Sequence, residues 1–127
     1  MATLSWPMEN FRRLKVMAKV RPLVVMVYAV TEGFPPSELY GATSQMRRAA
    51  FGIGLAISEG CGRGTTPDPI RFLTYANGSA QELEYAALQS VDLKFSTAER
   101  LDPVIAGAQE IQKMLCALIT ALRRRTN

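Results

Sequence analysis

The sequence contains no histidine and only two cysteines. The lack of histidine removes the most common general base and the most common metal ligand. Cys61 and Cys116 lie far apart and show no CxxC spacing, so we expect neither a zinc site nor a disulfide in a reducing compartment. The remaining polar residues form no recognisable set of nucleophile, base and orienting group. We therefore predict a protein that is not an enzyme and that needs no cofactor or metal.

The sequence also lacks a long apolar run. The longest one covers residues 23–30, whereas a transmembrane helix needs about 20 apolar residues. The N-terminal stretch MATLSWPMENFRRLK has no apolar core of the kind found in signal peptides. We expect a cytoplasmic protein with no membrane partner.

Charge is unevenly distributed along the chain, which carries a net charge of +4. Residues 26–122 contain more acidic than basic side chains, and the basic excess lies at the two ends. If these ends meet in space, they would form a surface for nucleic-acid phosphates. The alternative is a solubilising surface with a basic helix C-terminus, which the helix dipole favours by itself. The candidate nucleic-acid contacts are Arg12, Arg13, Lys15, Lys19, Arg123, Arg124 and Arg125.

Apolar residues recur at steps of three and four along four segments, which predicts helices over about 14–33, 37–61, 68–93 and 97–124. In the first segment, Pro22 either kinks the helix or delays its start to about Arg21. The last segment has a sustained heptad seam from Leu101 to Leu122. No linker divides residues 1–127. The sequence therefore predicts one all-α domain, an antiparallel up-down-up-down four-helix bundle.

The helix ends also carry sequence signals. Ser37 is the expected N-cap of the second helix. Ser96 and Glu99 form a capping-box signature before the fourth helix, and Pro103 suggests a short first turn with Asp102 as a second cap. Gly78 lies inside the third helix, where we interpret it as a position of close helix contact.

The second segment, YGATSQMRRAAFGIGLAISEGCGRG, is apolar or small on most sides. Its inner stripe runs from Leu39 through Met46 to Ile57, while Phe51 and Leu55 lie on another side. Such a helix is expected to be buried on most of its circumference. The terminal glycines do not form a phosphate loop, because they follow a helix and lack the GK[ST] ending.

Arg47 and Arg48 allow two interpretations. They could form ion pairs with Glu59, Glu82 or Glu84 from a neighbouring helix or subunit, or they could bind phosphate. The planar guanidinium suits both roles, because it binds carboxylate and phosphate groups with two parallel hydrogen bonds.

Three motifs carry a family resemblance: TSQMRRAA at 43–50, SEGCGR at 58–63, and IRFL, GS and ELE within 70–84. With them, residues from about 11 to 122 resemble the 23S rRNA intervening-sequence protein family, which includes the accessory variability proteins of diversity-generating retroelements. The chain departs from this family where an asparagine would stand, since it has Ala56 there. The residues that match family motif positions or are candidates for inter-subunit pairing are Arg47, Arg48, Glu59, Arg63, Arg71 and Glu82, and Gly78 also matches a family motif position.

The resemblance implies a four-helix bundle that forms a ring-shaped homopentamer. In the retroelement branch it implies nucleic-acid binding and a reverse transcriptase as partner. The leading hypothesis is a non-enzymatic oligomer that binds nucleic acid without reading its sequence. The alternative is a protein-interaction scaffold with no nucleic-acid binding.

Overall fold

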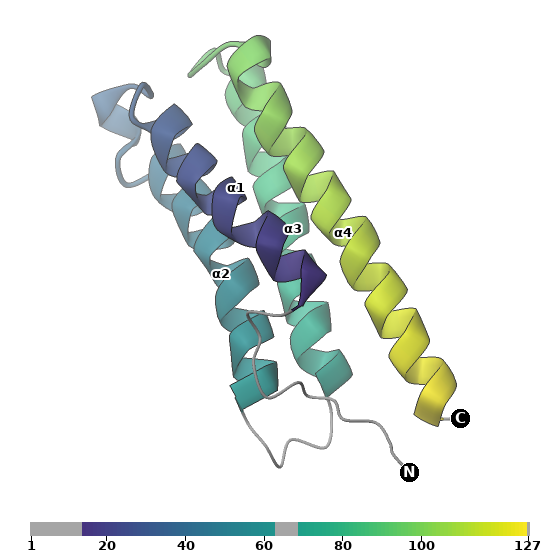
Figure 1. Cartoon of the computed structure of the whole chain (residues 1–127). Helices are drawn as coiled ribbons and strands as arrows, with labels where there is room; N and C mark the ends of the chain where they lie inside the picture. Colours follow the sequence, from purple (N-terminus) through teal and green to yellow (C-terminus); the bar gives the residue numbers. More distant parts are fainter. Residues whose placement is uncertain (1–13, 63–68, 127) are drawn as a thin grey trace.

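The structure, a computed structural model, describes residues 14–62 and 69–126. These residues form four long helices, α1 (Lys15–Thr31), α2 (Ala42–Gly62), α3 (Pro69–Asp92) and α4 (Ala98–Thr126), and a single 3-10 turn, η2 (Pro36–Glu38). Figure 1 shows that α1 and α3 run in one direction and α2 and α4 in the other. The predicted all-α four-helix bundle is thus confirmed.

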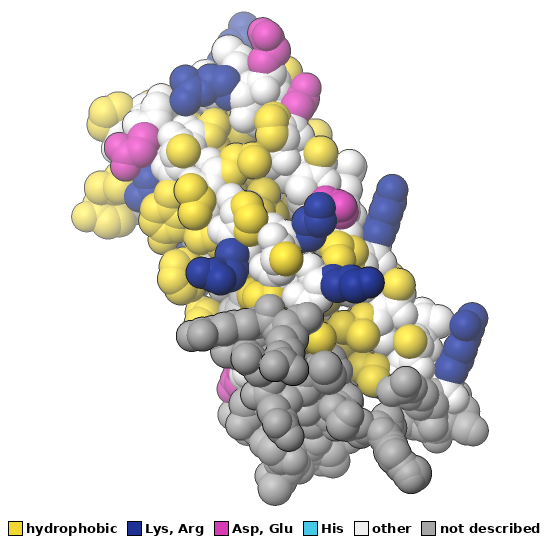
Figure 2. Space-filling view, in the orientation of Figure 1, with side chains coloured by type: hydrophobic (Ala, Val, Ile, Leu, Met, Phe, Trp, Pro, Cys, Tyr) yellow, Lys and Arg dark blue, Asp and Glu magenta, His cyan; other side chains and the backbone are white. Residues whose placement is uncertain are grey.

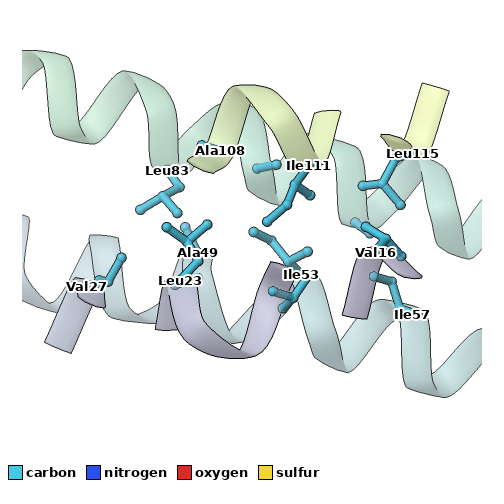
Figure 3. Close-up of a cluster of buried hydrophobic side chains, with 14 of the residues drawn as sticks. Val16, Leu23, Val27, Ala49, Ile53, Ile57, Leu83, Ala108, Ile111 and Leu115 are labelled. Atoms are coloured by element: carbon cyan, nitrogen blue, oxygen red, sulfur yellow. The ribbon is translucent and has the colours of Figure 1, made fainter. Parts of the chain in front are cut away.

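The helices pack around a square. α2 packs against α1 and α3, and α4 also packs against α1 and α3, so α1 and α3 occupy opposite corners. Figure 3 shows side chains of all four helices meeting in the core, among them Val27 of α1, Ile53 of α2, Leu83 of α3 and Ile111 of α4. These four side chains are fully buried. The apolar spacing in the sequence therefore identified the inner faces correctly.

Two prolines lie inside helices without ending them. α1 begins at Lys15, close to the predicted start at about residue 14, and continues through Pro22, so the alternative start near Arg21 does not occur. α4 likewise continues through Pro103, and the predicted short first turn with a second cap at Asp102 does not occur. Both prolines are exposed. The carbonyl groups that lose their helical hydrogen bonds can therefore be hydrated, which lowers the penalty of an internal proline.

The predicted start of the second helix is wrong. Ser37 belongs to η2, and α2 begins five residues later at Ala42. The carboxylate of Glu38 accepts a hydrogen bond from the Ala42 backbone N–H at 3.1 Å. The carboxylate of Glu38, four residues before Ala42, thus satisfies a backbone amide at the N-terminus of α2, where a negative charge is also favoured. Leu39, expected in the inner stripe, lies before α2 and is half exposed.

The cap of α4 is one residue away from the expected one. The side chain of Thr97, rather than that of Ser96, accepts a hydrogen bond from the backbone N–H of Arg100 at 3.2 Å. The Thr97 carbonyl also accepts the first helical bond, from Leu101. Further along α4, the residues of the seven-residue apolar repeat rotate gradually away from the core, because the helix has 3.6 and not 3.5 residues per turn. Near its end Leu118 is only half-buried, and Ile119 takes its place in the core.

Gly60 of α2 and Gly78 of α3 differ in how closely a neighbouring helix approaches them. A Cβ at Gly60 would stand 2.9 Å from the Cβ of Phe72. Here α2 and α3 approach so closely that only glycine fits. A Cβ at Gly78 would meet no atom of the described residues within 4 Å, apart from its own helix backbone. The interpretation of Gly78 as a close-contact position is therefore wrong, although the helix does continue through it.

Candidate functional site

Arg47 connects α2 to the C-terminal end of α1. Its Nε donates a 2.9 Å hydrogen bond to the hydroxyl of Thr31, and its Nη2 lies 3.4 Å from the carbonyl oxygen of Tyr28. The guanidinium carbon stands 4.5 Å from the centre of the Tyr28 ring, within the range of a cation–π contact. The Thr31 hydroxyl in turn donates to the carbonyl oxygen of Val27 at 2.7 Å. Arg47 therefore adds a charged donor to the Thr31 hydroxyl and to the Tyr28 carbonyl, which already accepts the backbone N–H of Glu32 at 3.2 Å.

The acidic partner of Arg47 was not among those predicted. The Nη2 atom of Arg47 lies 3.5 Å from a carboxylate oxygen of Glu32, the residue that directly follows α1. Glu84 instead accepts hydrogen bonds from the side chains of Gln109 and Gln112 on α4, at 2.9 and 2.7 Å. Helix position alone could not reveal either contact, because both depend on how neighbouring helices are rotated and offset.

The other described motif residues lie at the surface of the bundle. Arg48, Glu59, Arg71 and Glu82 are all exposed on α2 or α3. Arg71 stands 5.2 Å from the ring centre of its neighbour Phe72. Arg63 lies outside the described residues. Arg47 is thus a packing residue of the bundle, while Arg48 faces solvent one position further along.

Figure 1 shows that α1 begins near the middle of the bundle, whereas α4 ends at the bottom of the view. Lys15 and Lys19 of α1 and Arg123 and Arg124 of α4 are exposed. Lys19 lies 3.5 Å from a carboxylate oxygen of Glu110, and both side chains are about half exposed. Arg12, Arg13 and the side chain of Arg125 lie outside the described residues. The described basic residues of the two segments thus lie on neighbouring helices, with Lys19 beside the middle of α4 and Arg123 and Arg124 near its end.

An apolar hollow lies between α1 and α2, and we call it the α1–α2 groove. It has a volume of about 330 Å³. Met17, Val20 and Val24 line it from α1, and Phe51, Gly54 and Leu55 line it from α2. Phe51 is 51% and Leu55 58% exposed, so α2 is not buried on all the sides that its sequence predicts. Figure 2 shows apolar side chains crossing this face of the molecule, with Lys and Arg side chains among them.

Glycine helps to shape this groove. A Cβ at Gly54 would stand 3.4 Å from a methyl group of Val20 and 3.8 Å from the sulfur of Met17. The bare backbone at Gly54 therefore forms part of the floor. Arg21 is the one charged residue that lines the groove among the described residues, and Ser58 is also polar but donates its hydroxyl hydrogen to the carbonyl of Leu55. The groove suits an apolar ligand surface that carries negative charge near Arg21.

The cysteines do not form a reactive pair. Both are free, with Cys61 buried and Cys116 exposed. Burial raises the pKa of the Cys61 thiol, because the low-polarity surroundings disfavour the thiolate. Within the described ranges, no three His, Cys, Asp or Glu side chains converge as metal ligands would. The helices described here also include none that is long and apolar enough to cross a bilayer.

Comparison with known sequences identifies the family. The sequence model of the 23S rRNA-intervening sequence proteins matches residues 12–117 of this chain. The chain belongs to that family. No curated protein matched. A solved structure from the S23 ribosomal protein family of Bacteroides thetaiotaomicron, of unknown function, superimposes with a TM-score of 0.72.

This similarity covers 82% of the present chain and 97% of the Bacteroides chain, at 24% sequence identity. At that level of identity the comparison supports the fold alone. The intervening-sequence family match covers all four helices, with the last one only in part, and it includes the Arg47–Arg48 pair and Gly54, Gly60 and Gly78. The resemblance recognised from the sequence motifs is therefore confirmed.

Proposed function

We propose that this intervening-sequence family protein is a non-enzymatic scaffold that assembles with copies of itself, as a homopentamer, and binds nucleic acid through its basic surface. The observation that carries the proposal is the uncovered α1–α2 groove. Phe51 and Leu55, two large apolar side chains, stand more than half exposed beside it. Large contiguous apolar surface on a water-soluble bundle indicates an interaction site.

The basic surface supports the nucleic-acid part of the proposal. Lys15 and Lys19 are exposed on α1, and Arg123 and Arg124 are exposed on the neighbouring helix α4. In an oligomer each copy of the chain would contribute the same positive charges. Contacts of this kind bind phosphate and do not read bases, so we expect no preference for sequence. Each neutralised phosphate releases a counterion, and affinity should therefore fall steeply with salt.

Assembly is tested by light scattering coupled to size-exclusion chromatography over a wide range of protein concentration. We expect a species of five times the 14.0 kDa chain mass. A mass of one chain at every concentration would reject assembly. A different multiple would keep the scaffold and reject the pentamer.

Nucleic-acid binding is tested by fluorescence anisotropy with duplex DNA and structured RNA at two salt concentrations. The variant Lys15→Ala/Arg124→Ala should weaken binding and flatten its salt dependence by about one unit of logarithmic slope per lost contact. Arg100→Ala is the control, because it removes an exposed positive charge from the start of α4, at the other end of the bundle. Absence of binding at low salt would favour the alternative, a scaffold that binds proteins only.

A further inference from the structure

The outer face of α3 presents an apolar surface of a different kind from the α1–α2 groove. Tyr75, Tyr85 and Leu88 are 56%, 65% and 47% exposed. Glu82 and Asp92 are also exposed, and their spacing along the helix places them on the same side as Tyr85 and Leu88. We call these five residues the α3 ridge. It combines large apolar side chains with negative charge.

The charges of the two surfaces are complementary. Arg21 lines the groove, and α1 has no acidic residue from its start to Thr31, whereas Lys19 lies on the α4 side of α1, where it pairs with Glu110. Between Phe72 and Asp92, the charged residues of α3 are all acidic. A helix with acidic and apolar side chains is the kind of surface that an apolar groove with a basic edge binds best.

The groove and the ridge of one chain cannot meet. The groove lies between α1 and α2, and the ridge lies on the outer side of α3, which is at the corner of the bundle opposite α1 (Figure 1). Within residues 14–62 and 69–126, neither surface is therefore covered by the other. A second copy of the chain can offer its ridge to the groove of the first copy, and a further copy can offer its groove to the ridge.

We propose that the α3 ridge of one copy binds in the α1–α2 groove of the next. The proposal rests on the self-assembly proposed above and names the surfaces that carry it. Tyr85 and Leu88 would pack against Phe51 and Leu55, with the acidic residues of the ridge near Arg21. Because the two contacting surfaces differ, each copy binds two neighbours in a head-to-tail manner. Such contacts close into rings when the rotation between copies allows it, whereas a contact between identical surfaces stops at a dimer.

Two variants with matched controls test this arrangement. Leu55→Glu places a carboxylate in the groove, and Tyr85→Glu/Leu88→Glu places two on the ridge. The controls are Tyr40→Glu and Leu39→Glu/Tyr40→Glu, because these side chains are exposed on the connection before α2, outside both surfaces. Circular dichroism should show unchanged helix content in all four proteins. We expect the control proteins to assemble like the unmodified chain, and each test variant alone to have the 14.0 kDa mass of one chain.

Mixing the two test variants is the decisive experiment. The Leu55→Glu chain keeps an intact ridge, and the Tyr85→Glu/Leu88→Glu chain keeps an intact groove. Their mixture should therefore form a one-to-one pair, which cannot grow because its outer surfaces both carry new carboxylates. Light scattering should show twice the mass of one chain.

Three results would overturn the proposal while leaving self-assembly in place. The first result is that both test variants still assemble. The second is that Leu55→Glu loses assembly while Tyr85→Glu/Leu88→Glu keeps it. The third is that the mixture of the two variants stays monomeric. A single-chain mass for the unmodified protein at every concentration would instead reject self-assembly itself, and this proposal with it.

Discussion

The guanidinium Nε of Arg47 donates a 2.9 Å hydrogen bond to the hydroxyl of Thr31, and this bond links the second turn of α2 to the last residue of α1. The hydroxyl of Thr31 is buried, and the Arg47 side chain is 23% exposed. The hydrogen bond between Arg47 and Thr31 is therefore largely shielded from water, which would otherwise compete for both groups. It explains why one arginine of the adjacent pair is structural while Arg48 faces solvent.

Replacing Arg47 with alanine should destabilise the bundle by about 1–2 kcal/mol, because Thr31 and the Tyr28 carbonyl lose a charged donor. The ion pair with Glu32 should contribute little, since the Glu32 side chain is 80% exposed. Chemical denaturation at fixed protein concentration measures the change. Arg48→Ala is the matched control and should change stability by less than about 0.5 kcal/mol. Equal effects of the two variants would contradict the assigned role of Arg47.

Alanine at Gly60 and at Gly78 should have opposite effects on stability. Gly60→Ala forces the α2–α3 contact apart at Phe72 and should cost about 1–3 kcal/mol. Gly78→Ala meets open space and should stabilise the helix by about 0.5–1 kcal/mol, since alanine loses less backbone entropy on folding. Thermal unfolding of both variants provides the comparison. The close approach at Gly60 would be disproved if its alanine variant were as stable as the Gly78 variant.

The N-cap of α4 can be located by a pair of single substitutions. Thr97→Ala removes the acceptor of the Arg100 amide and should destabilise the protein by about 1 kcal/mol. Ser96→Ala should have an effect below about 0.5 kcal/mol. Denaturant titration distinguishes them, and a larger loss for Ser96→Ala would restore the capping box that the sequence indicates.

The two thiols should differ in reactivity. In the native protein, iodoacetamide at mildly alkaline pH should modify the exposed Cys116 and leave Cys61 unmodified, because Cys61 is buried and its pKa is raised. Mass spectrometry counts the modified thiols. In denaturant both should react, and a Cys116→Ser protein should show no fast labelling in the native state.

Cys61 should also make stability depend on alkaline pH. Because its pKa is raised in the folded protein, its contribution is complete below the pKa of an unfolded thiol, about 8.5. It should decline as the pH rises from there through the folded pKa, since the unfolded state loses its proton first. The decline should be smaller in Cys61→Ala, as measured by unfolding at a series of pH values. Parallel pH profiles for the two proteins would refute the effect.

Local patterns predicted the helices well and their ends less well. The apolar spacing placed Val27, Ile53, Leu83 and Ile111 on inner faces, and all are buried. The residues that cap the helices were harder to predict, because several neighbouring polar side chains can accept hydrogen bonds from the same backbone amides. Ser37 and Ser96 were reasonable candidates, but Glu38 and Thr97 make the bonds.

The sequence by itself determined that this chain forms four helices and which side of each helix is buried, since both depend on residues within a few turns of one another. Only the tertiary structure decided that Arg47 binds the end of α1, that Gly60 and not Gly78 marks a close approach, and that the α1–α2 groove stays open. These features depend on the rotation and offset of one packed helix against another. Those are set by side-chain packing across the whole core.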